Sequence, residues 1–483
     1  MSNKSKSIIL LISKSFGLII NMISIMIIAR FLSVSNYGEY RQIITVVGIL
    51  VSIFSVGLPS SALYFLSGKE KDKYLPNLMF SLLLLSGAFI ILSYPIMVLF
   101  NTIFSTDMFT DSYFLIAVII SLSFIVSIIE NLFISYNKFK FIVIVTILPN
   151  LVFMGFILYC YFYNENLFLI LLSLLIRELL KVSILLYFIY KQKLDLQSLK
   201  PSRVKEVMYF GIPLGLSTII ASLNINIDKL VVGRFMDNEA FAIISNGSYE
   251  IPILGLIGVS LFNILVPNLK SKLDTNNFSE VIELWKRTGK VMITVVVPIT
   301  IGTIVFAKEV ILILFSEKYL NAVFLFQIYQ INALSRIYIY GSFFLAAGKS
   351  KVYTLNSIIH LTNNLVLNCL LIIPFGLVGV AIATVISNVI QIILQNFQIA
   401  KIVNSRPSAL FPYKSFLKAN LISIILFVLP YYIYTNIFGV NTIVGLILMM
   451  FLIIIAIIIL NYTITREILD YILSFYKKLR TKN

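Results

Sequence analysis

Nine ionisable side chains lie inside long apolar stretches of the sequence, where a charge is unfavourable unless it is paired, hydrated or used. The bases are Lys14, Arg177, Lys181, Lys229 and Arg336, and the acids are Glu130, Glu178, Asp228 and Glu250. Their chemistry favours binding of a charged ligand or movement of protons. Because Lys and Arg are in excess, the preferred ligand is an anion such as a pyrophosphate or an acidic sugar.

A structural role is the alternative for some of these residues. Glu178 could be neutralised by its neighbours Arg177 and Lys181, and Asp228 by Lys229. For Glu178 this is at least as well supported as a ligand role. Lys181 and Lys229 also lie near the ends of apolar stretches, where a lysine can extend to the membrane interface.

Polar residues recur at helical spacing in five of the apolar stretches, so each set shares one helix face. The sets are Lys14, Gly17, Asn21 and Ser24; Ser217, Asn224 and Asp228; Tyr329, Asn332, Arg336 and Tyr340; Asn356, His360, Asn364 and Asn368; and Thr384, Asn388, Gln391, Gln395 and Gln398. Hydrogen bonds between helices would explain single Ser, Thr or Asn residues. The whole set is better explained by a hydrated central cavity, because such faces must meet protein or water.

Proton or ion coupling has three candidates, His360, Glu130 and Asp228. His360 could titrate near neutral pH, although a buried, hydrogen-bonded histidine is an equally good interpretation.

Several chemistries are disfavoured. The two cysteines, Cys160 and Cys369, lie far apart in apolar stretches, and a lone histidine does not make a metal cluster. The segment Gly348–Ser350 resembles the end of a P-loop, but position 343 is Phe where that motif needs Gly. The net charge of +17 is spread over short loops, unlike a nucleic-acid surface. We therefore expect no cofactor, metal, nucleotide or nucleic acid, and no enzymatic activity.

The elements that position these residues are membrane spans. The 483 residues are 59% apolar and 12% charged, and apolar runs long enough to cross a bilayer recur from end to end. We predict an all-α polytopic membrane protein with about fourteen transmembrane helices. They are placed at 8–30, 42–67, 76–99, 113–135, 141–163, 167–190, 208–233, 242–268, 291–307, 321–347, 352–373, 376–400, 415–436 and 440–464.

Charge placement supports this count. If the spans alternate in direction, 28 of the 38 Lys and Arg residues lie in the segments on one side, five lie on the other and five are inside spans. By the positive-inside rule, both termini are cytoplasmic.

Short repeats indicate a duplication six spans apart. The first span ends at Ala29-Arg30-Phe31 and the seventh at Gly233-Arg234-Phe235. We predict a six-helix bundle at 1–190, a basic cytoplasmic linker at 191–207, a second six-helix bundle at 208–400, and two further helices with a cytoplasmic tail at 401–483.

The sequence resembles the oligosaccharide flippases of the MOP exporter superfamily, specifically bacterial O-antigen or capsule repeat-unit transporters. The matching segments are ARFLSVSNYGEY (29–40), YFGIPLGLSTI (209–219), NIDKLVVGRF (226–235), ILFSEKY (313–319), AAGKSK (346–351) and PFGLVGVAIATVIS (374–387).

The resemblance implies two bundles in a V shape around a cationic cleft that opens alternately to each side of the bacterial inner membrane. It implies an undecaprenyl-pyrophosphate-linked oligosaccharide as cargo, with membrane lipids, a polysaccharide polymerase and chain-length proteins as partners. Carried over to this sequence, it assigns Lys14, Asn21 and Arg30 to the cleft, facing Asp228 and Lys229. The family usually has Arg after that Asp, so Lys229 is a conservative departure.

Two related functions stay open. A multidrug and toxin extrusion antiporter shares the bundle plan, but fourteen spans and a basic cavity are unfavourable for cationic drugs. A peptidoglycan-precursor (lipid II) flippase also has fourteen spans. A membrane glycosyltransferase would need a larger outer loop than any found here.

Overall fold

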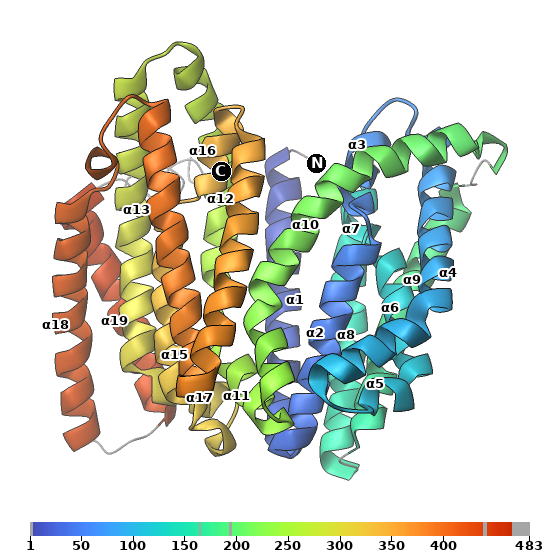
Figure 1. Cartoon of the computed structure of the whole chain (residues 1–483), viewed down its shortest axis with the longest axis horizontal. Coiled ribbons are helices and arrows are strands. Elements are labelled where there is room, and N and C mark those ends of the chain that lie inside the picture. Colours follow the sequence, from blue (N-terminus) through green and yellow to red (C-terminus); the bar gives the residue numbers. More distant parts are fainter. Residues whose placement is uncertain (1–2, 164–165, 193–195, 438–441, 466–483) are drawn as a thin grey trace, which may run out of the picture. The chain divides into compact units, whose positions relative to one another are not determined.

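The computed structural model describes residues 3–163, 166–192, 196–437 and 442–465. Every regular element in these ranges is a helix, which confirms the predicted all-α class (Figure 1). Several charged residues of the predicted loops and tail lie outside the described residues: Glu165, Lys193, Arg466, Lys477, Lys478, Arg480 and Lys482.

Two compact units divide the chain, unit 1 at Met1–Ala242 and unit 2 at Ile243–Asn483. This division follows spatial contacts, whereas the halves predicted at 1–190 and 208–400 follow sequence repetition. A division by contacts does not test a division by sequence repeats. The duplicated halves, the linker 191–207 and the appended segment 401–483 therefore remain predictions.

Unit 1 contains the first ten α-helices. They are α1 (Asn3–Phe31), α2 (Val34–Phe54), α3 (Leu58–Leu66), α4 (Lys71–Phe104), α5 (Met108–Asp111), α6 (Tyr113–Val126), α7 (Ile129–Ser135), α8 (Phe139–Tyr163), α9 (Leu167–Gln192) and α10 (Pro201–Phe235), with a 3₁₀ turn η1 at Leu196–Ser198. Helix α1 packs along α8, and α8 packs along α9.

Helix α10 belongs to unit 1 because it packs on α2, α3 and α4. The contact is close at the 50° bend between α2 and α3. There Gly57 has a φ of 71°, and a Cβ at this position would lie 2.2 Å from the carbonyl oxygen of Gly211 on α10. The bend therefore needs glycine for its backbone conformation and for room.

The middle of the predicted linker 191–207 is held against α4 by the side-chain amide of Asn77. Asn77, which is fully buried, donates to the carbonyl of Ser198 at 3.2 Å and accepts from the backbone N–H of Lys200 at 2.9 Å. The hydroxyl of Ser198 donates in return to the carbonyl of Lys73 at 3.3 Å. This segment is thus anchored to unit 1.

Helix α11 (Asn238–Gly247) crosses the boundary between the units. In unit 1, the side chain of Asn238 donates to Glu39 of α2 at 3.1 Å and accepts from Gln42 at 3.0 Å. In unit 2, Gly247 packs against Leu325.

Within the described residues, unit 2 continues with eight further α-helices. They are α12 (Pro252–Asp274), α13 (Phe278–Val305), α14 (Ala307–Leu314), α15 (Ala322–Ile331), α16 (Tyr340–Ala346), α17 (Ser350–Ile402), α18 (Tyr413–Ile437) and α19 (Thr442–Leu460). Between them are the 3₁₀ segments η2 (Glu317–Tyr319), η3 (Asn332–Ile337) and η4 (Pro407–Ala409), and a π-helical turn η5 (Asn461–Thr465) follows α19.

Helix α13 is the centre of unit 2, because α12, η3, α18 and α19 all pack on it (Figure 1). Its Trp285 is fully buried, and the indole stacks on the ring of Tyr338 with centroids 4.5 Å apart. This contact holds the segment after η3 in place.

Ten helices in the described ranges are long and apolar enough to cross a membrane, or eleven if the bent pair α2 and α3 forms one span. The chain is therefore a multi-pass membrane protein, as predicted. The count of fourteen stays a prediction, and α17 shows why the counts differ. Its 53 residues are too long for one crossing, and Gly376 interrupts it with φ 56° and ψ −137°.

Candidate functional site

In unit 1, two of the predicted site residues form one ion pair. Lys14 of α1 and Glu130 of α7 lie 2.6 Å apart, with 46% and 44% of their side chains exposed. A charged pair this accessible is stable at membrane depth only if it faces water or protein. The sequence had assigned these residues to cargo binding and to coupling, and the structure joins them.

A second charged group of unit 1 lies on α9. One carboxylate oxygen of Glu178, a residue that is 3% exposed, accepts hydrogen bonds from Arg177 and Lys181, each at 2.9 Å. The guanidinium of Arg177 also lies 4.9 Å from the ring centroid of Phe153 on α8. The group carries one net positive charge in a mostly buried position, so mutual neutralisation, the structural alternative, is only partial.

The remaining predicted residues of unit 1 lie on α1 and α10. Asp228 is 5% exposed, and its carboxylate accepts from the backbone N–H of Lys229 at 2.8 Å. Asn224 is partly buried one turn earlier. On α1, Asn21 is exposed, and Arg30 donates to the carbonyl of Met26 at 3.2 Å.

Unit 2 has two helix breaks where the sequence predicted continuous spans. Residues 248–251 separate α11 from α12, and the 3₁₀ segment η3 with Tyr338 and Ile339 separates α15 from α16. The predicted spans 242–268 and 321–347 are therefore each divided. A 3₁₀ helix has poorer hydrogen-bond geometry than an α-helix, and irregular backbone in a membrane protein is tolerated where it is buried in protein or lines a cavity.

The two breaks are tied to each other. Gln330, just before η3, donates to the carbonyl of Tyr249 at 3.2 Å. Arg336 of η3 forms an ion pair with Glu250, and both side chains are exposed. Discontinuous helices with charged residues at the break are typical of substrate sites in transporters.

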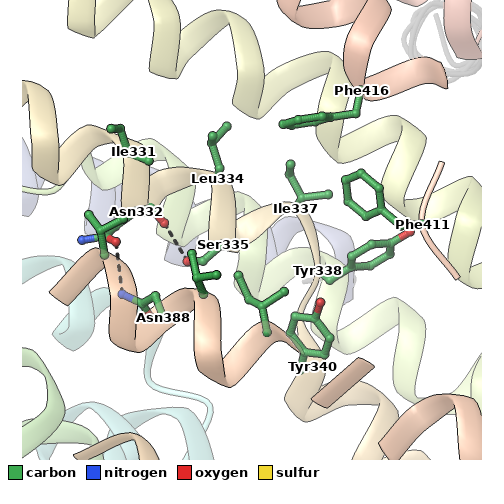
Figure 2. A pocket seen from close by; sticks show the side chains of 13 residues that line it. Ile331, Asn332, Leu334, Ser335, Ile337, Tyr338, Tyr340, Asn388, Phe411 and Phe416 are labelled. Carbon is green, nitrogen blue, oxygen red and sulfur yellow. Dashed lines mark hydrogen bonds between the residues drawn. The ribbon is translucent and has the colours of Figure 1, made fainter. Parts of the chain in front are cut away.

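A pocket of about 210 Å³ lies against the second break (Figure 2). Its wall is formed by seven residues between 331 and 340, by four between 385 and 392 on the second half of α17, and by Phe411 and Phe416 near the start of α18. Figure 2 shows the amides of Asn332 and Asn388 pointing at each other, and Asn388 donates to Asn332 at 3.2 Å.

The polar row predicted for the eleventh span is a feature of the first half of α17. Asn356, His360, Asn364 and Asn368 recur every four residues, and all are buried. Asn368 donates to Asn364 at 3.2 Å, and Asn356 exchanges two hydrogen bonds with Gln398 on the second half. The predicted Gln391 is partly buried on that second half.

Comparison with known proteins decides the family. The family model described as polysaccharide biosynthesis protein matches residues 4–269, which is more than half of the chain. The chain belongs to the polysaccharide biosynthesis protein family.

Relatives and solved structures agree with this membership. The capsular polysaccharide biosynthesis protein CapF of Staphylococcus aureus is 25% identical over 195 residues, which are 40% of this chain and about half (49%) of that relative. The lipid II flippase MurJ, in an inward closed conformation, has a TM-score of 0.73 at 19% identity and covers 97% of this chain and 100% of its own. An inward-facing multidrug resistance MATE transporter of the MOP superfamily has a TM-score of 0.63 at 12% identity, covering 80% and 95%.

The predicted membership of a polysaccharide-assembly family is thereby confirmed, and the fold is the one seen in MOP superfamily transporters. The two solved structures that share this fold are a flippase and a transporter. At these identities the solved structures establish the fold, and the cargo is a separate question.

One buried acid was missed by the sequence reasoning. Glu309 of α14 is fully buried beside Tyr431 of α18, and burial raises the pKa of its carboxyl above the ordinary 4.5. The available signal was an acid within the run AKEVILIL at 307–314, but the adjacent Lys308 made it look like a solvated loop.

Proposed function

We propose that this protein is a flippase that moves an undecaprenyl-pyrophosphate-linked oligosaccharide repeat unit from the cytoplasmic to the outer leaflet of the bacterial inner membrane, by alternating access, for capsule or O-antigen assembly. Both termini are cytoplasmic in this proposal. A polysaccharide polymerase and chain-length proteins receive the product.

The observation that carries the proposal is the broken span of unit 2, with Arg336 on its 3₁₀ segment and Glu250 at the neighbouring break. An arginine can bind a pyrophosphate through several N–H groups at once, and a partner carboxylate can keep the arginine in place while no cargo is bound. Membership of the polysaccharide biosynthesis protein family supports a sugar-bearing cargo, and the capsular relative supports a polysaccharide repeat unit.

Other charged groups have proposed roles in the same transport. Lys14, Arg177, Lys181 and Lys229, with Arg30 and the amides of Asn21, Asn224, Asn364, Asn388 and Gln391, are the proposed contacts for the pyrophosphate and the sugars. Glu130, Asp228 and His360 are the proposed groups for proton or ion coupling. The basic excess of this set suits an anionic cargo.

The test is deletion of the gene followed by localisation of the lipid-linked repeat unit. A flippase defect traps the intact unit on the cytoplasmic face, where a membrane-impermeant lectin or oxidant cannot reach it in right-side-out vesicles. Accumulation of single units on the outer face would contradict the proposal and indicate a role after translocation.

Transport of lipid II is the second candidate, favoured by the structural similarity to MurJ along nearly the whole chain. It predicts that the gene sustains growth when a native lipid II flippase is depleted. Failure to sustain growth, together with loss of surface polysaccharide on deletion, would favour the repeat unit.

A further inference from the structure

The 3₁₀ segment η3 forms one side of the pocket in Figure 2. A 3₁₀ helix has three residues per turn, so residues three apart form a ridge along it. Two of the three ridges line the pocket, Ile331 with Leu334 and Ile337, and Asn332 with Ser335 and Tyr338. The third ridge carries Ala333 and Arg336, which do not line it. One short helix therefore separates an apolar pocket from a cationic side chain.

Polar groups at the rim of the pocket are already hydrogen-bonded within the protein. The hydroxyl of Ser335 donates to the carbonyl of Asn332 at 2.6 Å, and that of Tyr338 donates to the carbonyl of Leu410 at 2.9 Å. Asn388 donates to the side chain of Asn332. A sugar or phosphate in the pocket would lose its hydration without gaining equivalent partners. Along the apolar wall the occupant must therefore be a hydrocarbon, whereas Asn332 and Asn388 lie at the polar edge, where Asn388 can still meet the polar part of the cargo.

Aliphatic and aromatic side chains provide the rest of the wall. Val385, Val389 and Ile392 line it from α17, and Phe411 and Phe416 line it from the start of α18. Val389 is 48% exposed, so the pocket is accessible and not sealed.

We propose that this pocket binds a segment of the isoprenoid chain of the lipid-linked cargo while the pyrophosphate lies at Arg336. The proposal rests on the proposed function and adds where the lipid part of the substrate goes. Arg336 and the pocket share one helix of six residues, so a single amphipathic molecule can reach both around that helix.

Phospholipid acyl chains are weaker occupants for a physical reason. Bilayer hydrocarbon is as apolar as the pocket wall, so moving an acyl chain from the bilayer gains little. A chain whose headgroup is already bound nearby has a high effective concentration at the pocket. The pocket thus selects the tail of the anchored cargo and fixes its direction relative to the headgroup.

Photo-crosslinking to the full-length protein in phosphatidylglycerol nanodiscs tests the assignment. The probe is a polyisoprenyl pyrophosphate that carries a benzophenone on its chain, and a phosphatidylglycerol with a benzophenone on one acyl chain is the comparison. We expect the isoprenyl probe to label peptides that contain residues 331–340 and 385–392. Equal labelling by the phosphatidylglycerol probe would overturn the proposal.

Two substitutions on α17 form a matched pair. Val389→Trp fills the pocket, and isoprenyl labelling should fall about tenfold, which corresponds to about 1.4 kcal/mol of lost binding. Ile393→Trp, one turn away, 50% exposed and outside the lining, should label like the wild type. If Val389→Trp does not fold, Val385→Phe fills the same pocket from the preceding turn. Unchanged labelling in a folded filling variant would contradict the assignment.

The labelling test can fail independently of the proposed function. Labelling reports binding and needs no transport. If gene deletion traps the repeat unit inside but the filling variants still label normally, only the pocket assignment is wrong. If deletion traps nothing inside, the proposed function itself is wrong.

Discussion

At the residue scale, an ion pair between membrane-embedded helices can have two roles. It can hold the helices together as a latch, or its charges can take part in transport. A latch between Lys14 and Glu130 depends only on opposite charges, so exchanging the two residues would keep it. A transport role depends on where each charge lies. The 2.6 Å pair is half-exposed, so both roles are sterically open to it.

We predict that the exchange Lys14→Glu with Glu130→Lys keeps protein abundance normal and lowers surface polysaccharide about tenfold to hundredfold. This corresponds to loss of one hydrogen bond to a charged group, about 1.5–3 kcal/mol. The measurement is polymer yield per cell against membrane protein level. The exposed pair Lys270 and Asp274 on α12 is the control, and its exchange should leave the yield unchanged. Full polymer from the Lys14 and Glu130 exchange would identify the pair as a latch.

The buried carboxyl of Glu309 should make the stability of the protein depend on pH. Because burial raises its pKa, the folded protein holds this proton more tightly than the unfolded chain, whose carboxyl titrates near 4.5. The contribution to stability is complete below pH 4.5 and is lost as the pH rises through the folded pKa. Glu309→Gln should therefore raise the melting temperature at about pH 7.5, by about 1 °C for each kcal/mol gained in a chain of this length.

The gain from Glu309→Gln should vanish below pH 4.5, where both forms are uncharged. Glu283→Gln, on the exposed face of α13, should give no gain at either pH. A gain that is independent of pH would show that packing, and not ionisation, is responsible.

Sequence patterns predicted some of this site and missed the rest for identifiable reasons. The row from Asn356 to Asn368 was predictable because a four-residue period survives in an intact helix. The Lys14 partner was not, because Glu130 lies on a helix far along the chain and only packing brings them together.

At the element scale, the structure differs from the prediction mainly at broken helices, such as the break between α15 and α16. The segment Asn332–Ile339 reads NALSRIYI and contains neither proline nor glycine, so the usual signal of a helix break is missing there. The break is held by tertiary contacts, in particular the stacking of Tyr338 on Trp285. Sequence periodicity reports local preference and cannot register such a contact.

Gly376 shows the opposite case, a break that the sequence did signal between the predicted spans 352–373 and 376–400. Its φ of 56° with ψ of −137° is a conformation that residues with a Cβ rarely adopt, although the space around it is open. We predict that Gly376→Ala destabilises the protein by about 1–3 kcal/mol through backbone strain. The measurement is thermal unfolding in detergent.

Gly155→Ala is the matched control for Gly376→Ala. Gly155 lies within α8 in ordinary helical conformation, also with open space around its Cα. Alanine there should stabilise by about 0.5–1 kcal/mol. Destabilisation of similar size in both variants would mean that Gly376 has no special backbone role.

At the scale of the whole molecule, the charge distribution predicts which side of the membrane each segment faces, and helix lengths alone cannot predict this. Ten or eleven helices satisfy length and apolarity in the described ranges, whereas the alternation of basic segments calls for fourteen. Helix α9 shows one cause of the difference, because Arg177, Glu178 and Lys181 make it too charged for a simple apolarity criterion. The same charged residues that make α9 a candidate site thus remove it from a count based on apolarity.

Cysteine accessibility settles the number of crossings by α17. In a background with Cys160→Ala and Cys369→Ala, we predict that Lys349→Cys and Asn404→Cys react with a membrane-impermeant maleimide only after the inner face is exposed. Phe375→Cys, which replaces a 60% exposed side chain beside Gly376, should react from the outside in intact cells. The reason is that two crossings return the chain to the side on which α17 began, and the basic residues assign that side to the cytoplasm. Lys318→Cys is the outer-face control. Reaction of Lys349→Cys and Phe375→Cys from the same side would mean that the first half of α17 does not cross the membrane.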